Sequence, residues 1–205
     1  MLTFAQYLAG AAQKGEAVNT LFEERLFDLV DVLHKITDAL TAEHIPHELI
    51  GGLAVLIQVE EANPEHSTLT RDVDLMVRRP DLGRIQEAAA KTGFRFRHAA
   101  GVDMLLGGGT DSKRNAVHLI FAGEKVRPNQ ATPNPPIEPE KKRIHGIEVP
   151  VISVAGLVRM KLSSFRLKDQ VHIQSMDAAG LITPEVETAL PEELRSRLRH
   201  VRETE

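Results

Sequence analysis

The stretch Thr70 to Val77, TRDVDLMV, constrains the fold most, because a short apolar run carries two aspartates one residue apart. The polar loop ANPEHSTLTR precedes the run and Pro80 follows it, as is typical of a short strand. Side chains at positions i and i+2 of a strand point to the same face. Asp72 and Asp74 are therefore predicted to share one face of a sheet.

Two carboxylates on one face have two interpretations. Like charges at that distance repel each other and favour protonation, unless a cation lies between them. A hard divalent cation removes the repulsion, and oxygen ligands suit Mg²⁺. The alternative is a hydrated strand end that binds nothing, and the sequence DVD alone favours that alternative. The surrounding sequence has to decide.

A glycine pair lies 20 residues upstream, between HELI and LAVLIQVEEA. This pattern predicts a strand, a turn at Gly51 and Gly52, and a helix. Glycines at such a turn let the backbone approach a phosphate, and a helix N-terminus offers free N–H groups and a positive dipole end. The alternative is a tight turn with no ligand. Together, the turn and the carboxylate strand suggest a site in which the turn holds a triphosphate and the carboxylates hold the metal that bridges it.

The remaining pattern predicts an α+β fold, a mixed sheet flanked by helices with a helical C-terminal part. Helical periodicity starts near a capping box at Thr20 and Glu23 and returns at DLGRIQEAAAKTG and after Val154. FRFRHAA, AVHLIFAG and KKRIHGIEVPVIS resemble strands. GVDMLLGGGTDSKRN contains a glycine-rich turn, and the proline-rich residues 126–139 resemble a connector. The predicted segments are an N-terminal helical part (1–45), an α/β core (46–153) and C-terminal helices packed on the core (154–205).

LIGGLAV followed by LTRDVDLMV resembles the nucleotidyltransferase superfamily, which shares its fold with DNA polymerase beta. The similarity is strongest to small bacterial nucleotidyltransferases, including abortive-infection-type toxins, several of which have Thr or Ser where Thr70 stands. The later stretch VPVISVAGLVRMKLSSFRLKDQVHIQSM is also similar, with Lys161, Lys168 and Asp169 at the matching positions. The resemblance covers roughly residues 47 to 180. It implies that Thr70, Lys168 and Asp169 belong to the nucleotide site.

The resemblance also implies a reaction. Asp72 and Asp74 would bind Mg²⁺, Gly51 and Gly52 would contact the β- and γ-phosphates, and Lys161 would neutralise triphosphate charge. An acceptor hydroxyl would attack the α-phosphorus, and pyrophosphate would leave. The implied partners are a nucleoside triphosphate and an acceptor such as tRNA, a protein or a small molecule. For a toxin they include an antitoxin.

One position departs from the family pattern. Active members carry a third carboxylate on a neighbouring strand, whereas AVHLIFAG offers His118. Three hypotheses follow. His118 acts as the base or as a ligand to Mn²⁺; a shifted acid, Asp103 or Glu124, completes the site; or the chain is a degenerate nucleotide-binding or regulatory module without turnover.

Composition excludes other classes. The 205 residues carry a net charge of -4, which argues against a general nucleic-acid coat or a membrane-surface protein. The absence of cysteine excludes disulfides and a cysteine nucleophile. The start lacks the features of a secretory signal and no window suits a membrane-spanning helix, so a cytoplasmic protein is expected. The basic stretch RSRLRHVR is interpreted as a solvated helix face rather than an RNA contact.

Overall fold

The computed structural model describes residues 26–204, apart from 69, 71, 108–115 and 145. Residues 26–42 are helical, and the cap predicted at Thr20 and Glu23 lies outside the described residues. The strands are β1 (His47–Ile50), β2 (Val73–Val77), β3 (Arg95–Ala99), β4 (Val102–Leu106), β5 (Ala116–Phe121), β6 (Glu140–Ile144) and β7 (Ile147–Val151). The helices are α2 (Gly51–Ala62), α3 (Leu82–Lys91), α4 (Val154–Ser164), α5 (Leu167–Ala178), α6 (Pro184–Thr188) and α7 (Glu192–Glu203), with short 3₁₀ turns η1 (Pro64–His66) and η2 (Arg79–Asp81).

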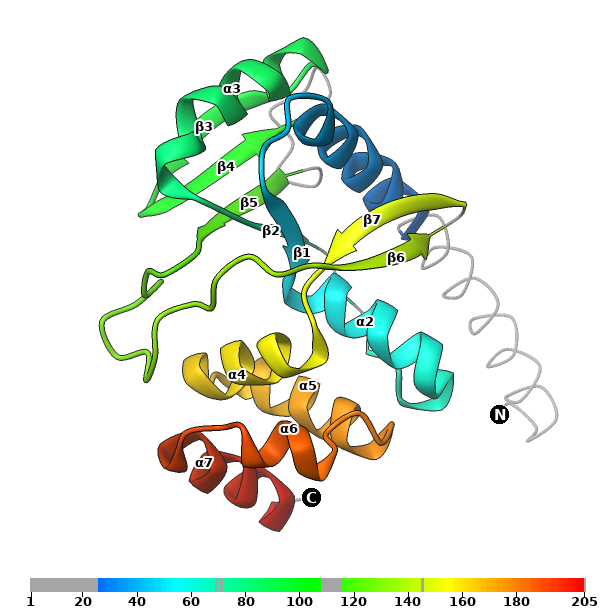
Figure 1. Ribbon diagram of the computed structural model, residues 1–205, viewed down its shortest axis with the longest axis vertical. Coiled ribbons are helices and arrows are strands. Elements are labelled where there is room, and N and C mark those ends of the chain that lie inside the picture. Colours follow the sequence, from blue (N-terminus) through cyan, green and yellow to red (C-terminus); the bar gives the residue numbers. More distant parts are fainter. Residues whose placement is uncertain (1–25, 69, 71, 108–115, 145, 205) are drawn as a thin grey trace, which may run out of the picture.

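The strands form one mixed sheet of seven, in the order β3-β4-β5-β2-β1-β7-β6. β2 is parallel to β5 and β1 is parallel to β7, while the other neighbours are antiparallel. Figure 1 shows α3 and the helix of residues 26–42 toward one side of the sheet, with α2 and α4 to α7 toward the other. This is the predicted α+β arrangement with a helical C-terminal part.

The two central strands carry the predicted carboxylate site. Val73, Leu75, Met76 and Val77 of β2 are completely buried, which explains why the strand is apolar apart from Asp74. Asp74 lies directly opposite Ile50 of β1 and His118 of β5. Residues directly opposite each other on neighbouring strands point to the same face. The Asp74 and His118 side chains therefore share one face of the sheet.

β4 was not predicted, because only a glycine-rich turn was recognised in the segment that contains it. Its five residues pair with β3 on one side and β5 on the other. These ladders supply backbone hydrogen bonds that local sequence does not reveal. Most of the glycine-rich part that follows lies outside the described residues.

The proline-rich connector between β5 and β6 has no helix or strand, as its composition predicted. It packs against α4, since the backbone N–H of Ala131 donates to the carbonyl oxygen of Ser163 at 3.2 Å. The backbone N–H of Thr132 donates to Ser163 Oγ at 2.8 Å. The Asn134 amide also donates to the carbonyl oxygen of Phe121 at 3.0 Å. These bonds hold the connector between the sheet and the C-terminal helices.

One hydrophobic core draws residues from all three predicted segments, such as Leu33, Leu75 and Leu162. The boundaries predicted at residues 45 and 153 stay a prediction. Among the described residues, no helix combines the length and the apolar character that crossing a membrane requires.

Candidate functional site

Gly51 stands at the junction of β1 and α2, directly against Asp74. Its φ of +77° is in the left-handed region, which favours glycine. A Cβ atom at this position would lie 2.0 Å from Asp74 Oδ2, far inside van der Waals contact. Both backbone and space therefore require glycine here, and the carboxylate lies against the start of α2.

Gly52, the second glycine, is in contact with Thr70. A Cβ atom on Gly52 would lie 2.6 Å from Thr70 Oγ1 and 3.6 Å from His172 Cε1. The threonine two residues before Asp72 thus reaches the first turn of α2. The start of this helix is bordered by Thr70 and Asp74, which belong to the segment of β2, and by His172 of α5.

Asp72 and Asp74 differ in their exposure. Asp74 lies within β2, and its side chain is 25% exposed, whereas Asp72 comes just before the strand and is exposed. In the described part of the chain, no group of three or more His, Cys, Asp or Glu side chains could hold a metal ion. The chemistry of the pair still fits Mg²⁺, which proteins commonly bind through one or two carboxylates together with substrate phosphates.

His118 lies beside Asp74, with its Nδ1 atom 3.0 Å from Asp74 Oδ1. This hydrogen bond raises the pKa of His118 despite partial burial, and the charges of Asp74 and Asp72 add to the rise. Lys168 acts in the opposite direction, so its ammonium group also lies within electrostatic range of His118. The site therefore contains an Asp–His pair where a carboxylate was expected.

The two acids considered as substitutes lie elsewhere. Asp103 is directly opposite Leu119, so it points to the face of the sheet away from His118. It lies 2.5 Å from His98 Nδ1 and 3.6 Å from an Arg79 nitrogen. Glu124 accepts two hydrogen bonds from the same arginine, at 2.6 and 2.7 Å. The hypothesis that either acid completes the site is therefore wrong.

A cationic cluster closes the other side of the site, where α4 ends and α5 begins. Lys161 is almost completely buried, and its Nζ lies 3.3 Å from Asp169 Oδ1. Arg166 Nε donates to Asp169 Oδ2 at 2.7 Å, and the Arg166 backbone N–H donates to the same oxygen at 3.2 Å. Phe165, with a left-handed φ of 52°, makes the sharp turn that brings the two helices together.

Charge explains why this cluster holds. Burial raises the pKa of Asp169, but the Arg166 hydrogen bonds and the Lys161 charge outweigh burial and lower that pKa to about 2. Burial lowers the pKa of Lys161, while the charges of Asp169 and Asp74 oppose that shift. The charge of the Asp74 carboxylate also contributes to a raised pKa of Arg166, after the hydrogen bond to Asp169. The cluster therefore lies within electrostatic range of the β2 carboxylate.

The structure thus gathers the sequence-predicted residues, which are Gly51, Gly52, Thr70, Asp72, Asp74, His118, Lys161, Lys168 and Asp169. Asp169 is 1% exposed and lies behind Lys161 and Arg166. Sequence reasoning missed Arg166 and His172. The sequence motif could have identified Arg166, because this residue lies between the predicted Lys161 and Lys168. Burial lowers the pKa of His172 to about 4, so its ring is neutral at physiological pH.

The basic C-terminal helix does not add to the site. Arg195 and Arg199 pair with Glu192 on α7 itself. Arg202 binds Asp177 and Glu187, at 2.7 and 2.8 Å. Because these charges are paired within the chain, the interpretation as a solvated helix face fits better than an RNA contact.

The sequence matches no known protein family and no curated protein. Three solved structures are similar in fold. An antigenic nucleotidyltransferase-like protein from Paracoccidioides brasiliensis is 16% identical over 86% of this chain and 88% of its own, with a TM-score of 0.57. ANT(2")-Ia in complex with adenylyl-2"-tobramycin is 19% identical over 83% and 97%, with a TM-score of 0.53. The Megavirus polyadenylate synthase is 11% identical over 89% of this chain but only 39% of its own, also at 0.53.

Proposed function

We propose that this chain, which has the fold of the nucleotidyltransferase superfamily, is an enzyme that transfers a nucleoside monophosphate from a nucleoside triphosphate to a hydroxyl group. Mg²⁺ is the proposed metal and pyrophosphate the second product. The observation that carries this proposal is the position of Asp74. Its carboxylate touches the glycine turn and lies within electrostatic range of both Lys161 and Arg166.

The proposed triphosphate site lies between the glycine turn and the cationic cluster. The start of α2 at Gly51 and Gly52 offers backbone N–H groups and the positive end of a helix dipole. Lys161 and Arg166 supply positive charge from the opposite side, and Asp169 holds both in place. A carboxylate repels phosphate, so Asp169 is proposed as a positioning residue rather than a direct phosphate contact.

Asp72 and Asp74 are the proposed metal ligands. Both carboxylates would hold Mg²⁺, and the ion would supply positive charge that offsets the negative charge developing on the transferred group. Thr70, held against Gly52, is proposed to help border the phosphate site. Mn²⁺ is the alternative metal, because the His118 imidazole lies beside Asp74 and Mn²⁺ accepts imidazole as a ligand better than Mg²⁺ does.

His118 is the proposed base. When its Nδ1–H donates to Asp74, the neutral ring carries the lone pair on Nε2. That nitrogen takes the proton of the acceptor hydroxyl while the acceptor oxygen bonds to the α-phosphorus. The bond from the α-phosphorus to the leaving oxygen breaks, and pyrophosphate leaves. Asp74 stabilises the imidazolium that forms, as a carboxylate does in other Asp–His pairs.

The acceptor is proposed only as a hydroxyl compound. Of the similar structures, one contains adenylyl-2"-tobramycin and another is a polyadenylate synthase, so the same fold serves a small molecule and a polyadenylate product. The antitoxin partner implied by the sequence resemblance stays a prediction.

The test is transfer of an α-phosphate label from each of the four nucleoside triphosphates, with Mg²⁺ or Mn²⁺, to total RNA, to protein and to tobramycin. We expect transfer with at least one pair and a loss of more than about a hundredfold in Asp74→Asn. Asp31→Asn is the control, because Asp31 is an exposed residue that forms an ion pair with Lys35 at the surface, at 2.7 Å. Transfer at the wild-type rate in Asp74→Asn would contradict the proposal.

A second function remains, a nucleotide-binding module without turnover. The observation that favours it is His118 at the place of the third carboxylate. If the chain is such a module, the wild type binds nucleotide but transfers no label with either metal, and Asp72→Ala abolishes the binding. Transfer by the wild type would exclude it.

A further inference from the structure

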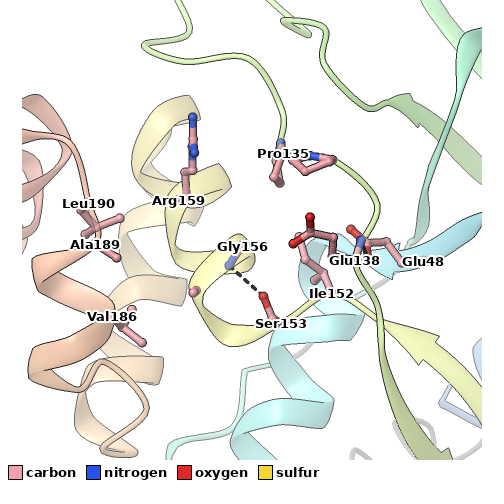
Figure 2. A pocket seen from close by; sticks show the side chains of 12 residues that line it. Glu48, Pro135, Glu138, Ile152, Ser153, Gly156, Arg159, Val186, Ala189 and Leu190 are labelled. Atoms are coloured by element: carbon pink, nitrogen blue, oxygen red, sulfur yellow. Dashed lines mark hydrogen bonds between the residues drawn. The ribbon is translucent and has the colours of Figure 1, made fainter.

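A pocket of about 340 Å³ lies on the side of α4 away from the carboxylates. Arg159 lines this pocket, whereas Lys161 faces the carboxylate site. Residues two apart on a helix differ by about 200° in direction, so the two side chains leave α4 on opposite sides. Figure 2 shows the pocket between the connector, the start of α4 and the segment around α6. It is a separate cavity that the proposed reaction does not use.

One end of the pocket is acidic. Glu48 is fully buried, and its Oε2 accepts a hydrogen bond from the backbone N–H of Glu138 at 3.1 Å. Its other oxygen, Oε1, is buried without a hydrogen-bond partner. Figure 2 shows the Glu138 carboxylate beside Glu48, at the edge of the pocket. Within the described residues no lysine, arginine or histidine forms an ion pair with either acid.

The pKa of Glu48 reflects this lack of a cation. Burial raises it to about 7, and the Glu138 charge adds to the rise, although the hydrogen bond from the Glu138 backbone opposes it. Glu48 Oε1, a buried carboxylate oxygen without a hydrogen-bond donor, reduces stability. A positively charged donor at this oxygen would remove that cost. The acidic end therefore fits an ammonium group.

The other end is positive. α4, which begins at Val154, supplies this end. Arg159 lies on the same helix, and its Nε atom is buried without a partner. Figure 2 places Arg159 well apart from the two glutamates. This end therefore fits a carboxylate.

Aliphatic side chains also line the pocket, among them Ile152, Val186 and Leu190. The volume is at the small end of the range for ligand pockets. We propose that the pocket binds a small aliphatic zwitterion of amino-acid type, with its ammonium group at Glu48 and Glu138 and its carboxylate at Arg159. Such a ligand satisfies the buried acceptor on Glu48 and the buried donor on Arg159 together.

The test is calorimetric titration of the full chain, without nucleotide, with glycine, L-leucine, 4-aminobutanoate and 6-aminohexanoate. Two half-ligands, n-butylamine and butanoate, separate the charges. We expect at least one zwitterion to bind saturably and at least tenfold more tightly than either half-ligand. No saturation by any zwitterion, or equal binding of a half-ligand, overturns the proposal. Because no nucleotide is present, the result is independent of the proposed enzyme activity.

Variants assign the binding to this pocket. Glu138→Gln and Arg159→Met are each expected to weaken the bound zwitterion at least tenfold, since each removes the charge at one end. Glu60→Gln and Arg127→Met are the matched controls, because both residues are exposed and lie outside the pocket. Glu138 is exposed and Arg159 half-buried, so both variants are expected to fold, and circular dichroism checks this. Unchanged binding in both pocket variants overturns the assignment.

Discussion

Two buried carboxylates on opposite sides of α4 show how the molecule divides its charges. Asp169 is 1% exposed and Glu48 is fully buried, so both have lost nearly all contact with water. Yet the pKa of Asp169 is about 2 and that of Glu48 is about 7. The difference comes from their partners, because Asp169 lies between Lys161 and Arg166, whereas Glu48 accepts one backbone hydrogen bond and has a second glutamate nearby.

The comparison suggests two different uses of buried charge. On the Asp169 side, cations are assembled and held in place before any ligand arrives, which suits the binding of a phosphate chain. On the Glu48 side, a carboxylate is held without a cation, which suits a ligand that carries positive charge. Each prediction below changes one member of this comparison.

The largest expected effect is that of Asp169→Asn. The change leaves the ammonium group of Lys161 buried without its anion, and breaking a buried pair in this way costs about 3–5 kcal/mol. Urea unfolding at pH 7 measures the loss. Asp177→Asn is the control, because its partner Arg202 is part of a surface network and the expected cost is about 1 kcal/mol or less. Equal losses of unfolding free energy in the two variants would show that the buried Asp169 ion pairs contribute no more to stability than a surface pair does.

The next effect has the opposite sign. Because the folded pKa of Glu48 is above its ordinary value of 4.5, the unfolded chain releases this proton first as pH rises. The stability that protonated Glu48 contributes is full below pH 4.5 and is lost as pH rises through about 7. Glu48→Gln keeps the acceptor for the Glu138 N–H but cannot ionise. The difference in unfolding free energy between Glu48→Gln and the wild type is expected to be about 2–3 kcal/mol more favourable to the variant at pH 8 than at pH 4.5.

Denaturant unfolding at both pH values, with Glu60→Gln as the exposed control, measures this change. An unaltered pH dependence in Glu48→Gln would mean that Glu48 is not the uncompensated acid that the comparison requires.

A smaller effect separates backbone strain from crowding on the carboxylate side. Gly51→Ala and Gly101→Ala both place alanine at a positive φ, +77° and +75°. Only the first Cβ meets another atom, since nothing lies within 4 Å of the position at Gly101. Both variants are expected to lose about 1–2 kcal/mol to strain. Gly51→Ala should lose more and should also lose nucleotide binding, because Asp74 has to move.

Thermal unfolding and nucleotide titration of both variants measure these losses. If Gly51→Ala binds nucleotide as Gly101→Ala does, the contact between Asp74 and the turn has no role in the site.

The two sides of α4 also differ in how far the sequence predicts them. The glycine turn and Asp74 belong to local patterns, so the strand–turn–helix at Gly51 and the position of Asp74 on a strand could be predicted from the sequence. Asp72 was also predicted on this strand, but β2 begins at Val73 and Asp72 lies just before it. Lys161 and Asp169 came from the family resemblance, but their ion pair depends on the turn at Phe165 between two helices. No periodicity reveals that turn.

Other features arise only from packing in three dimensions. β4 is stabilised by neighbours on both sides, and its own sequence predicted only a glycine-rich turn in that segment. Glu48 is one of two polar residues in a four-residue strand, and it is held by the connector, whose Glu138 comes 90 residues later. Asp103 was considered as one of the nearest acidic candidates. Its register with β5 then placed it on the other face.

The most direct test of the central claim is calorimetric binding of non-hydrolysable analogues of the four nucleoside triphosphates, with Mg²⁺ and with chelator. We predict saturable, metal-dependent binding of at least one analogue, lost in Asp74→Asn and weakened at least tenfold in Lys161→Met, with Glu60→Gln unchanged. Absence of binding for all four analogues, or binding that neither chelator nor Asp74→Asn affects, would contradict a metal–triphosphate site between β2 and the Lys161–Asp169–Arg166 cluster.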